Sequence, residues 1–260
     1  MTPDAARLAP LAQRLQSLHV PGTPVVVANA WDASSARVFE EAGFPAVATS
    51  SSAVARSLGY DDGELTPSNE MFDAVARIAR AVDVPVTADV ERGYGLGPEE
   101  IVTRLLAAGA VGCNLEDSDP RSGELVDARD HAGWLGRVRA AADEAGVPLV
   151  LNARNDVHLR EWGEPEERLP AAIERGRAYI AAGASCVYPI GISDIDEIQR
   201  FVRAVEGPVN IVFRPRGPSI AELGNAGVAR VSYGGGLHML MQHHLRAAAA
   251  RIGGGEDPYA

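Results

Sequence analysis

Three acidic residues end two apolar, strand-like segments of the chain. The segment PVTADVE ends in Asp89 and Glu91, and the segment AVGCNLE ends in Glu116. Residues two apart on a strand point to the same side, so Asp89 and Glu91 can point together into one site, which Glu116 can join from a neighbouring strand. Three carboxylates there would repel one another unless a cation lies among them. No His or Cys stands at ligand spacing, so we predict a hard ion, Mg²⁺, with Mn²⁺ fitting nearly as well.

An arginine ends a third strand-like segment, PLVLNAR. Arg154 offers a planar fork of donors that suits a substrate carboxylate or phosphate. A metal on one side of an anionic substrate and an arginine on the other suit chemistry that develops an enolate, because the negative charge spreads onto the oxygen of an α-oxo acid. A single acid at a strand end is usually a helix cap, but three acids facing an arginine favour a site.

Strand-like and helical segments alternate along the chain and must position these side chains. Helical patterns separate the strand-like segments, and several of them end in Ala-Gly just before the next segment. The eight strand-like segments are 23–30, 45–50, 85–90, 110–116, 148–154, 184–190, 208–213 and 228–233. Such alternation requires parallel pairing, and eight units in this length predict a (β/α)8 TIM barrel of class α/β. We expect one domain over residues 1–260, with a C-terminal helical extension; a doubly wound open sheet is the alternative.

Composition excludes several kinds of partner. The net charge of -11 argues against nucleic-acid and anionic-membrane surfaces, which require clustered Lys and Arg. The N-terminus has no basic segment followed by a continuous apolar stretch, and no apolar run is long enough to span a bilayer. We therefore expect a soluble, cytoplasmic protein in which Cys113 and Cys186 are buried thiols.

Four stretches of the chain resemble a known superfamily. In this order and spacing, ATSSSAVARSLGYDD, TADVERGYG, NLEDSDPRSGELVD and LNARND resemble the isocitrate lyase and phosphoenolpyruvate mutase superfamily, over residues 24–233. The resemblance implies a (β/α)8 barrel that exchanges its last helix between the subunits of a homodimer or homotetramer. It also implies a Mg²⁺ site that holds a small α-oxo or α-hydroxy acid or its enolate.

The resemblance also implies roles for individual residues. Asp89 would be the direct metal ligand, with Asp62, Glu91 and Glu116 joined to the metal mostly through water. Ser50, Ser51 and Arg154 would hold the carboxylate and oxo end of the substrate. Asn210 would touch its distal part. The implied substrate contacts are Ser50, Ser51, Asp62, Asp89, Arg154 and Asn210.

The chain departs from the family in the loop after Glu116, which in this family closes over the substrate and decides the reaction. Isocitrate and methylisocitrate lyases carry Lys-Lys-Cys-Gly-His there, with the Cys as proton-transfer group, and phosphoenolpyruvate mutase carries an Asn. Here the loop reads DSDPRSGELVD, which has neither signature. As catalytic candidates beside Arg154 we expect Arg121 to clamp a second carboxylate and Glu124 or Ser122 to move a proton.

The sequence thus predicts a Mg²⁺-dependent lyase that cleaves a C–C bond next to an enolisable α-oxo or α-hydroxy acid, by retro-aldol cleavage or decarboxylation. Two alternatives stay open. One is P–C chemistry on phosphonopyruvate or phosphoenolpyruvate, which Arg121 and Ser122 in place of a Lys-Thr pair favour. The other is a non-catalytic α-oxo acid binding protein, because the family's proton donor is missing from the loop.

Overall fold

Strands and helices alternate along the chain in the computed structural model, which describes residues 5–259. The strands are β1 (Val25–Ala30), β2 (Val47–Thr49), β3 (Val86–Asp89), β4 (Gly112–Glu116), β5 (Val150–Asn155), β6 (Cys186–Pro189), β7 (Asn210–Val212) and β8 (Arg230–Ser232). The helices are α1 (Ala5–Ser17), α2 (Ala33–Glu41), α3 (Ser51–Leu58), α4 (Ser68–Ala79), α5 (Pro98–Ala108), α6 (Ala128–Glu144), α7 (Pro165–Ala181), α8 (Ile195–Val205), α9 (Ile220–Asn225) and α10 (Gly236–Gly253).

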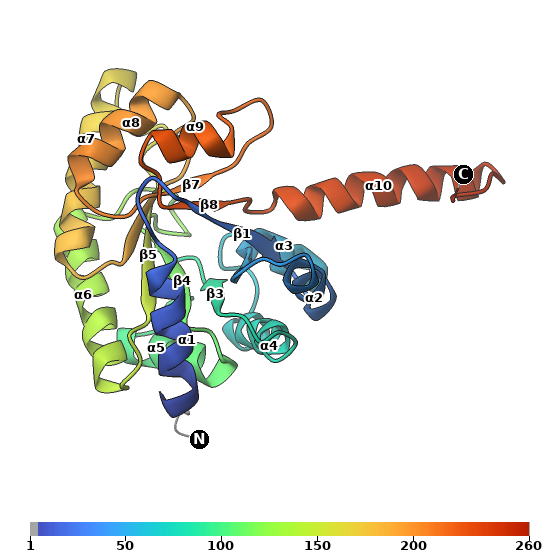
Figure 1. Cartoon of the computed structure of the whole chain (residues 1–260), viewed down its shortest axis with the longest axis horizontal. Coiled ribbons are helices and arrows are strands. Elements are labelled where there is room, and N and C mark those ends of the chain that lie inside the picture. Colours follow the sequence, from blue (N-terminus) through green and yellow to red (C-terminus); the bar gives the residue numbers. More distant parts are fainter. Residues whose placement is uncertain (1–4, 260) are drawn as a thin grey trace.

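The strands form one closed barrel. All of them pair in parallel, in the order β6-β5-β4-β3-β2-β1-β8-β7. A parallel bridge between Val187 and Val209 joins the two ends of this order. Helices surround the strands (Figure 1). The predicted (β/α)8 barrel is confirmed, and the open-sheet alternative is wrong because the two outer strands of an open sheet do not meet.

Glycine and proline fix where several helices begin and end. Gly59 after α3 and Gly109 after α5 have φ of 92° and 85°, a left-handed conformation that glycine adopts without steric cost. Pro98 occupies the first turn of α5, where its missing N–H leaves no hydrogen bond unmade. Because every strand pair is parallel, the carboxyl ends of all the strands lie on one rim of the barrel.

Helix α1 closes the opposite end of the barrel. Its Leu15 is fully buried. A Cβ atom on Gly112, at the start of β4, would lie 2.9 Å from Leu15 Cδ2 and 3.0 Å from both Thr87 Oγ1 and the Val150 carbonyl oxygen. Gly112 therefore leaves the space that Leu15 fills.

Replacing Gly112 with alanine is expected to destabilise the protein by about 1–3 kcal/mol, the usual cost of overpacking a core. The matched control is Gly133→Ala in α6, where an added Cβ meets nothing within 4 Å. The free energy of unfolding of that variant should rise by about 0.5–1 kcal/mol, because alanine is more stable than glycine in a helix interior. Urea unfolding measures both; equal shifts of the same sign would contradict the packing argument.

Buried histidines make stability depend on pH. His19 is 6% exposed, and its Nδ1 lies 2.9 Å from the Leu15 carbonyl oxygen. Burial, and then the charge of Arg230, lower the pKa of His19 to about 4 from its ordinary 6.5. The unfolded chain therefore binds more protons between these values, so stability falls as pH drops through 6.5 toward 4.

We expect this residue to account for about 2 kcal/mol of the stability lost between pH 7 and pH 5. The variant His19→Asn keeps a donor for the Leu15 carbonyl and cannot titrate. Its free energy of unfolding should therefore fall by about 2 kcal/mol less than that of the parent between pH 7 and pH 5. The histidine His131, whose pKa burial lowers to about 3, is retained in both proteins. Urea unfolding at the two pH values tests this; identical losses in both proteins would refute it.

Helix α10 extends away from the barrel (Figure 1). Only one of its residues, His238, is buried in the chain. Its exposed apolar side chains are Met239, Leu240, Met241, Leu245 and Ile252.

No helix in the described part of the chain combines the length and the apolar character needed to cross a membrane.

Candidate active site

The ends of β3, β4 and β5 bring the predicted site residues to one rim. Asp89 pairs in register with Asn114, and Glu116 pairs with Arg154. The backbone N–H of Glu116 donates to the Glu91 carbonyl at 3.0 Å. Asp89, Glu91, Glu116 and Arg154 therefore come from three adjacent strands, as the sequence predicts.

Asp89 has one occupied and one free carboxylate oxygen. Its Oδ2 accepts hydrogen bonds from the backbone N–H of Ser51 at 3.1 Å and from the Ser51 hydroxyl at 3.0 Å. Its own backbone N–H donates to Thr49 Oγ1 at 2.8 Å. Its Oδ1 is buried and has no hydrogen-bond partner. A buried carboxylate oxygen without a partner is costly unless an ion or water satisfies it.

Glu91 is held by a sharp turn at the end of β3. Its φ of 50° and the φ of Gly93 and Gly95, 98° and 70°, lie in the left-handed region. Its Oε2 accepts from the backbone N–H groups of Gly63 at 2.9 Å and Glu64 at 2.7 Å, and its Oε1 accepts from the Tyr94 hydroxyl at 2.7 Å. Burial raises its pKa to about 7, with a smaller raising contribution from Asp62 and Asp89. A nearby cation would favour the ionised form of this carboxylate.

Asp62 and the serines of the second strand end lie against Asp89. Burial, and next the charge of Asp89, raise the pKa of Asp62, while the charge of Arg154 and the Ser51 hydroxyl lower it. Ser50 caps α3, and its hydroxyl lies 3.2 Å from that of Ser52. Asp62 and Ser51 thus both lie close to Asp89, a proximity that the sequence around Asp62 does not reveal.

Glu116 and Arg154 form a buried ion pair. Arg154 Nη1 lies 2.5 Å from Glu116 Oε2. The other edge of the guanidinium binds Asp156, with Nε to Oδ1 at 2.6 Å and Nη2 to Oδ2 at 2.9 Å. Three fixed contacts hold the fork in one orientation, and its remaining N–H groups can bind an anion.

The carboxylates fit a metal that keeps most of its water. Within residues 5–259, no three Asp, Glu, His or Cys side chains converge closely enough to bind one metal ion directly. Asp89 Oδ1 is buried without a hydrogen-bond partner, and Asp89 lies close enough to Asp62, Glu91 and Glu116 for its charge to raise the pKa of each. One direct carboxylate with water between the ion and the other acids is how Mg²⁺ is often held.

The three loop candidates lie apart from this group. Arg121, Ser122 and Glu124 are exposed on a hairpin closed by an antiparallel bridge between Ser118 and Leu125. The backbone N–H groups of Arg121 and Ser122 donate to Asp119 Oδ1 at 2.9 and 3.0 Å. A cavity of about 720 Å³, lined by residues such as Arg121, Arg92, Tyr94 and Trp134, lies beside the hairpin.

Asn210 lies on β7, which does not neighbour β3, β4 or β5 in the barrel. It is fully buried, begins β7, and donates from Nδ2 to the Ser232 hydroxyl at 3.2 Å. It pairs with Arg230, the first residue of β8. Its side chain thus contacts Ser232, the last residue of β8, and the contact of Asn210 with the distal part of a substrate stays a prediction.

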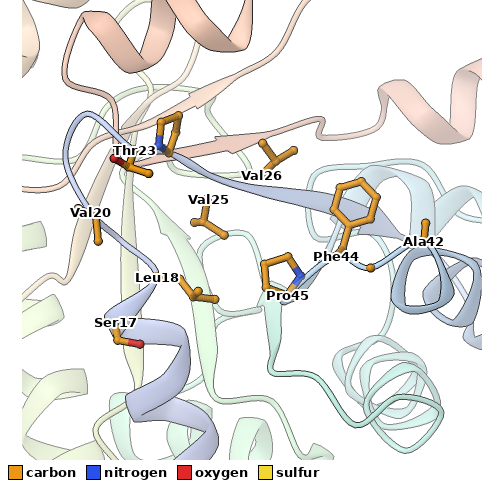
Figure 2. Close-up of a pocket in the computed structure, with 11 residues that line it drawn as sticks. Ser17, Leu18, Val20, Thr23, Val25, Val26, Ala42, Phe44 and Pro45 are labelled. Carbon is orange, nitrogen blue, oxygen red and sulfur yellow. The ribbon is translucent and has the colours of Figure 1, made fainter.

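A second, apolar pocket contributes no chemistry. It has a volume of about 460 Å³ and is lined by side chains from the end of α1, the start of β1 and the loop before β2, including Leu18, Val25 and Phe44 (Figure 2). None of its lining residues is acidic, basic, His or Cys. The chemistry lies with the polar strand ends.

Sequence reasoning gave no role to Asp156 or Asp117, which support Arg154. Asp156 follows Arg154 by two positions, so the two side chains share one side of the strand, a pattern that could have identified it. The backbone N–H of Asp156 donates to Asp117 Oδ1 at 2.8 Å, and both acids are fully buried. No sequence pattern predicts that contact, because it joins two strands.

Three comparisons relate the chain to known proteins. The model of the family described as Phosphoenolpyruvate phosphomutase matches residues 15–253. An uncharacterised protein of Mycobacterium tuberculosis is 32% identical over 248 residues, which cover 94% of this chain and 92% of that protein. The 2-methylisocitrate lyase of Escherichia coli is 28% identical over 74% of this chain and 70% of its own length.

A solved structure is also similar to the chain. The crystal structure of a candidate phosphonomutase from Burkholderia cenocepacia superposes with a TM-score of 0.86 at 41% identity, covering 92% of this chain and 98% of that one. The family match spans nearly all of the barrel, including every strand and each of the carboxylates described above. The chain therefore belongs to the phosphoenolpyruvate mutase family, within the isocitrate lyase and phosphoenolpyruvate mutase superfamily that its motifs resemble.

Proposed function

We propose that the protein is a Mg²⁺-dependent lyase that cleaves a C–C bond of a small α-oxo or α-hydroxy carboxylic acid through an enolate. The observation that carries this proposal is the free, buried Oδ1 of Asp89 on the same rim as the fixed fork of Arg154. The E. coli relative named as a 2-methylisocitrate lyase supports the lyase class.

Asp89 would hold Mg²⁺ directly, and Asp62, Glu91 and Glu116 would hold its water ligands. The bound ion would supply Lewis-acid stabilisation of a developing negative charge. Arg154, with Ser50 and Ser51, would bind the substrate carboxylate and oxo group. Because Asp156 fixes the guanidinium beforehand, little orientational freedom is lost on binding.

The hairpin would supply the proton chemistry. We propose that Arg121 clamps a second carboxylate and that Glu124 or Ser122 moves a proton after the hairpin shifts toward the rim, excluding water. Replacing Arg121 and Glu124 together with alanine should lower turnover at least about 100-fold, as expected for general acid-base groups. Unchanged turnover would eliminate both residues from the mechanism.

P–C chemistry is the second candidate. The Burkholderia cenocepacia relative at 41% identity is described as a candidate phosphonomutase, which favours phosphonopyruvate hydrolase or phosphoenolpyruvate mutase chemistry. The same metal and arginine would bind the α-oxo or α-hydroxy acid end of either substrate, so the bond that breaks and the group that is released separate the two candidates.

A substrate panel tests the proposal. Isocitrate, methylisocitrate, oxaloacetate and phosphonopyruvate are incubated with the protein and Mg²⁺, then with chelator, while α-oxo acid, CO₂ and phosphate are followed. Metal-dependent cleavage of a carboxylic acid supports the lyase, and phosphate release supports P–C chemistry. Oxalate, a planar dianion that resembles an enolate, serves as a binding probe. Oxalate binding without any turnover would identify a non-catalytic binding protein instead.

We further propose that the protein works in the cytoplasm as a homodimer or homotetramer that exchanges α10 between subunits. The exposed apolar side chains of α10 support this, because an isolated helix with such a face is rarely left in water. Replacing Leu240 and Leu245 with Ser should reduce the mass measured by light scattering to that of a single chain; an unchanged mass would refute the exchange.

A further inference from the structure

Asp117 is a fully buried carboxylate next to the site, and it connects several segments. It directly follows Glu116 at the end of β4. Its Oδ1 accepts the backbone N–H of Asp156 at 2.8 Å. Its Oδ2 accepts from the Tyr179 hydroxyl at 2.6 Å and from Arg175 Nη1 at 3.1 Å, both on α7. Three donors on one buried carboxylate leave its side chain a single orientation.

One arm of this network leads to Arg154. The backbone N–H that Asp117 binds belongs to Asp156, whose carboxylate grips the Arg154 fork. The Ser118 hydroxyl donates to Asp156 Oδ2 at 2.7 Å, from the residue after Asp117. Asp117 thus fixes the backbone of the residue that orients the arginine.

The other arm leads to the hairpin. Arg175 Nη1 donates to the Val126 carbonyl at 2.9 Å as well as to Asp117. The backbone N–H of Val126 donates to the Asp117 carbonyl at 2.8 Å. Asp117 and Arg175 therefore hold the two ends of the hairpin together where it leaves the barrel.

We propose that Asp117, with Arg175 and Tyr179, is a positioning element that couples the orientation of Arg154 to the placement of the 118–125 hairpin. This proposal rests on the proposed function, in which Arg154 binds the substrate carboxylate. None of the three residues contacts the substrate; they act through Asp156 and through the two ends of the hairpin. A shift of the hairpin would therefore be transmitted to the arginine fork through one carboxylate.

Two conservative variants disturb the network with little change in volume. In Asp117→Asn an NH₂ group replaces one of the two carboxylate oxygens, and an NH₂ group donates hydrogen bonds but does not accept them. That group then faces either the Asp156 N–H or the donors of Tyr179 and Arg175. Tyr179→Phe removes one donor and keeps the ring edge against His131, 5.0 Å between centroids. The control is Arg139→Gln, since Arg139 Nη1 binds the Leu149 carbonyl just before β5, at the other end of the barrel.

The first measurement is calorimetric titration of each protein with oxalate in the presence of Mg²⁺. Outer residues that orient a binding group commonly contribute 10–100-fold to affinity, so we expect about a tenfold loss for Asp117→Asn and a smaller loss for Tyr179→Phe. Arg139→Gln should bind oxalate like the parent protein, even if its thermal unfolding temperature falls as much as that of the two network variants. Equal losses of oxalate affinity in all three variants would show that the network contributes only to overall stability, and would overturn the proposal.

The second measurement does not depend on any ligand. Hydrogen exchange in the free protein should speed up together at the amides of Asp156 and Val126 in both network variants, and at neither amide in Arg139→Gln. If the parent protein fails to bind oxalate, the proposed function is wrong. The exchange pattern still shows whether Asp117 couples Asp156 to the hairpin. Faster exchange at only one of the two amides would overturn the coupling.

Discussion

Replacing Asp89 with alanine will remove Mg²⁺-dependent turnover and lower the affinity for oxalate in the presence of Mg²⁺ by about a thousandfold, which corresponds to about 4 kcal/mol. The variant deletes a buried carboxylate oxygen that has no hydrogen-bond partner among residues 5–259. It also frees the N–H and hydroxyl of Ser51, which bind its other oxygen. Calorimetry with oxalate, with and without chelator, measures the effect.

Two comparisons make the Asp89 experiment decisive. Asp89→Asn keeps the shape and an acceptor for Ser51 but lacks the charge, so it should lose nearly as much metal-dependent binding. Asp194→Asn changes an exposed carboxylate that caps α8 through the N–H groups of Asp196 and Glu197, and it should bind like the parent. Retention of metal-dependent binding in both Asp89 variants would assign the metal to other ligands.

Replacing Arg154 with lysine will lower kcat/KM by about 100–1000-fold, the scale observed when a preorganised group that stabilises developing charge is removed. Lysine keeps the positive charge between Glu116 and Asp156 but has one nitrogen in place of the three that bind them here. It cannot hold both acids and also present paired donors to a carboxylate. Steady-state kinetics on the active member of the substrate panel measures the loss.

The contrast with Asp156→Asn sharpens this result. That variant leaves Arg154 in place but weakens the grip on its fork, and it also alters the bond from the Ser118 hydroxyl, so we expect an intermediate loss of kcat/KM, mainly through a higher KM. If lysine at position 154 supports nearly parental turnover, then charge alone suffices there, and the argument from the geometry of the fork is wrong.

Much of the architecture could be predicted from the sequence. Apolar strand segments separated by helices ending in Ala-Gly specify a parallel barrel, and parallel pairing puts all carboxyl ends on one rim. That is why Asp89, Glu91, Glu116 and Arg154 could be grouped from the sequence alone.

The parts that could not be predicted depend on contacts between strands. Asn210 begins β7, and its side chain bonds to Ser232, 22 positions away at the end of β8, a contact that strand position alone does not reveal. Asp117 receives its donors from residues 39 to 62 positions away. The exposed turn around Arg121 is set by Asp119 capping two backbone N–H groups, which charge and spacing alone do not determine.

Closure of the barrel also determines when the chain can finish folding during synthesis. β1 pairs with β8, and Asn29 Oδ1 accepts from the N–H groups of Tyr233 and Gly234, 204 and 205 positions later. Until β8 leaves the ribosome, one edge of β1 has no partner, and open edges recruit other chains. Contacts so distant in sequence slow folding. Nascent chains halted before β8 should therefore require chaperone protection that the completed barrel does not.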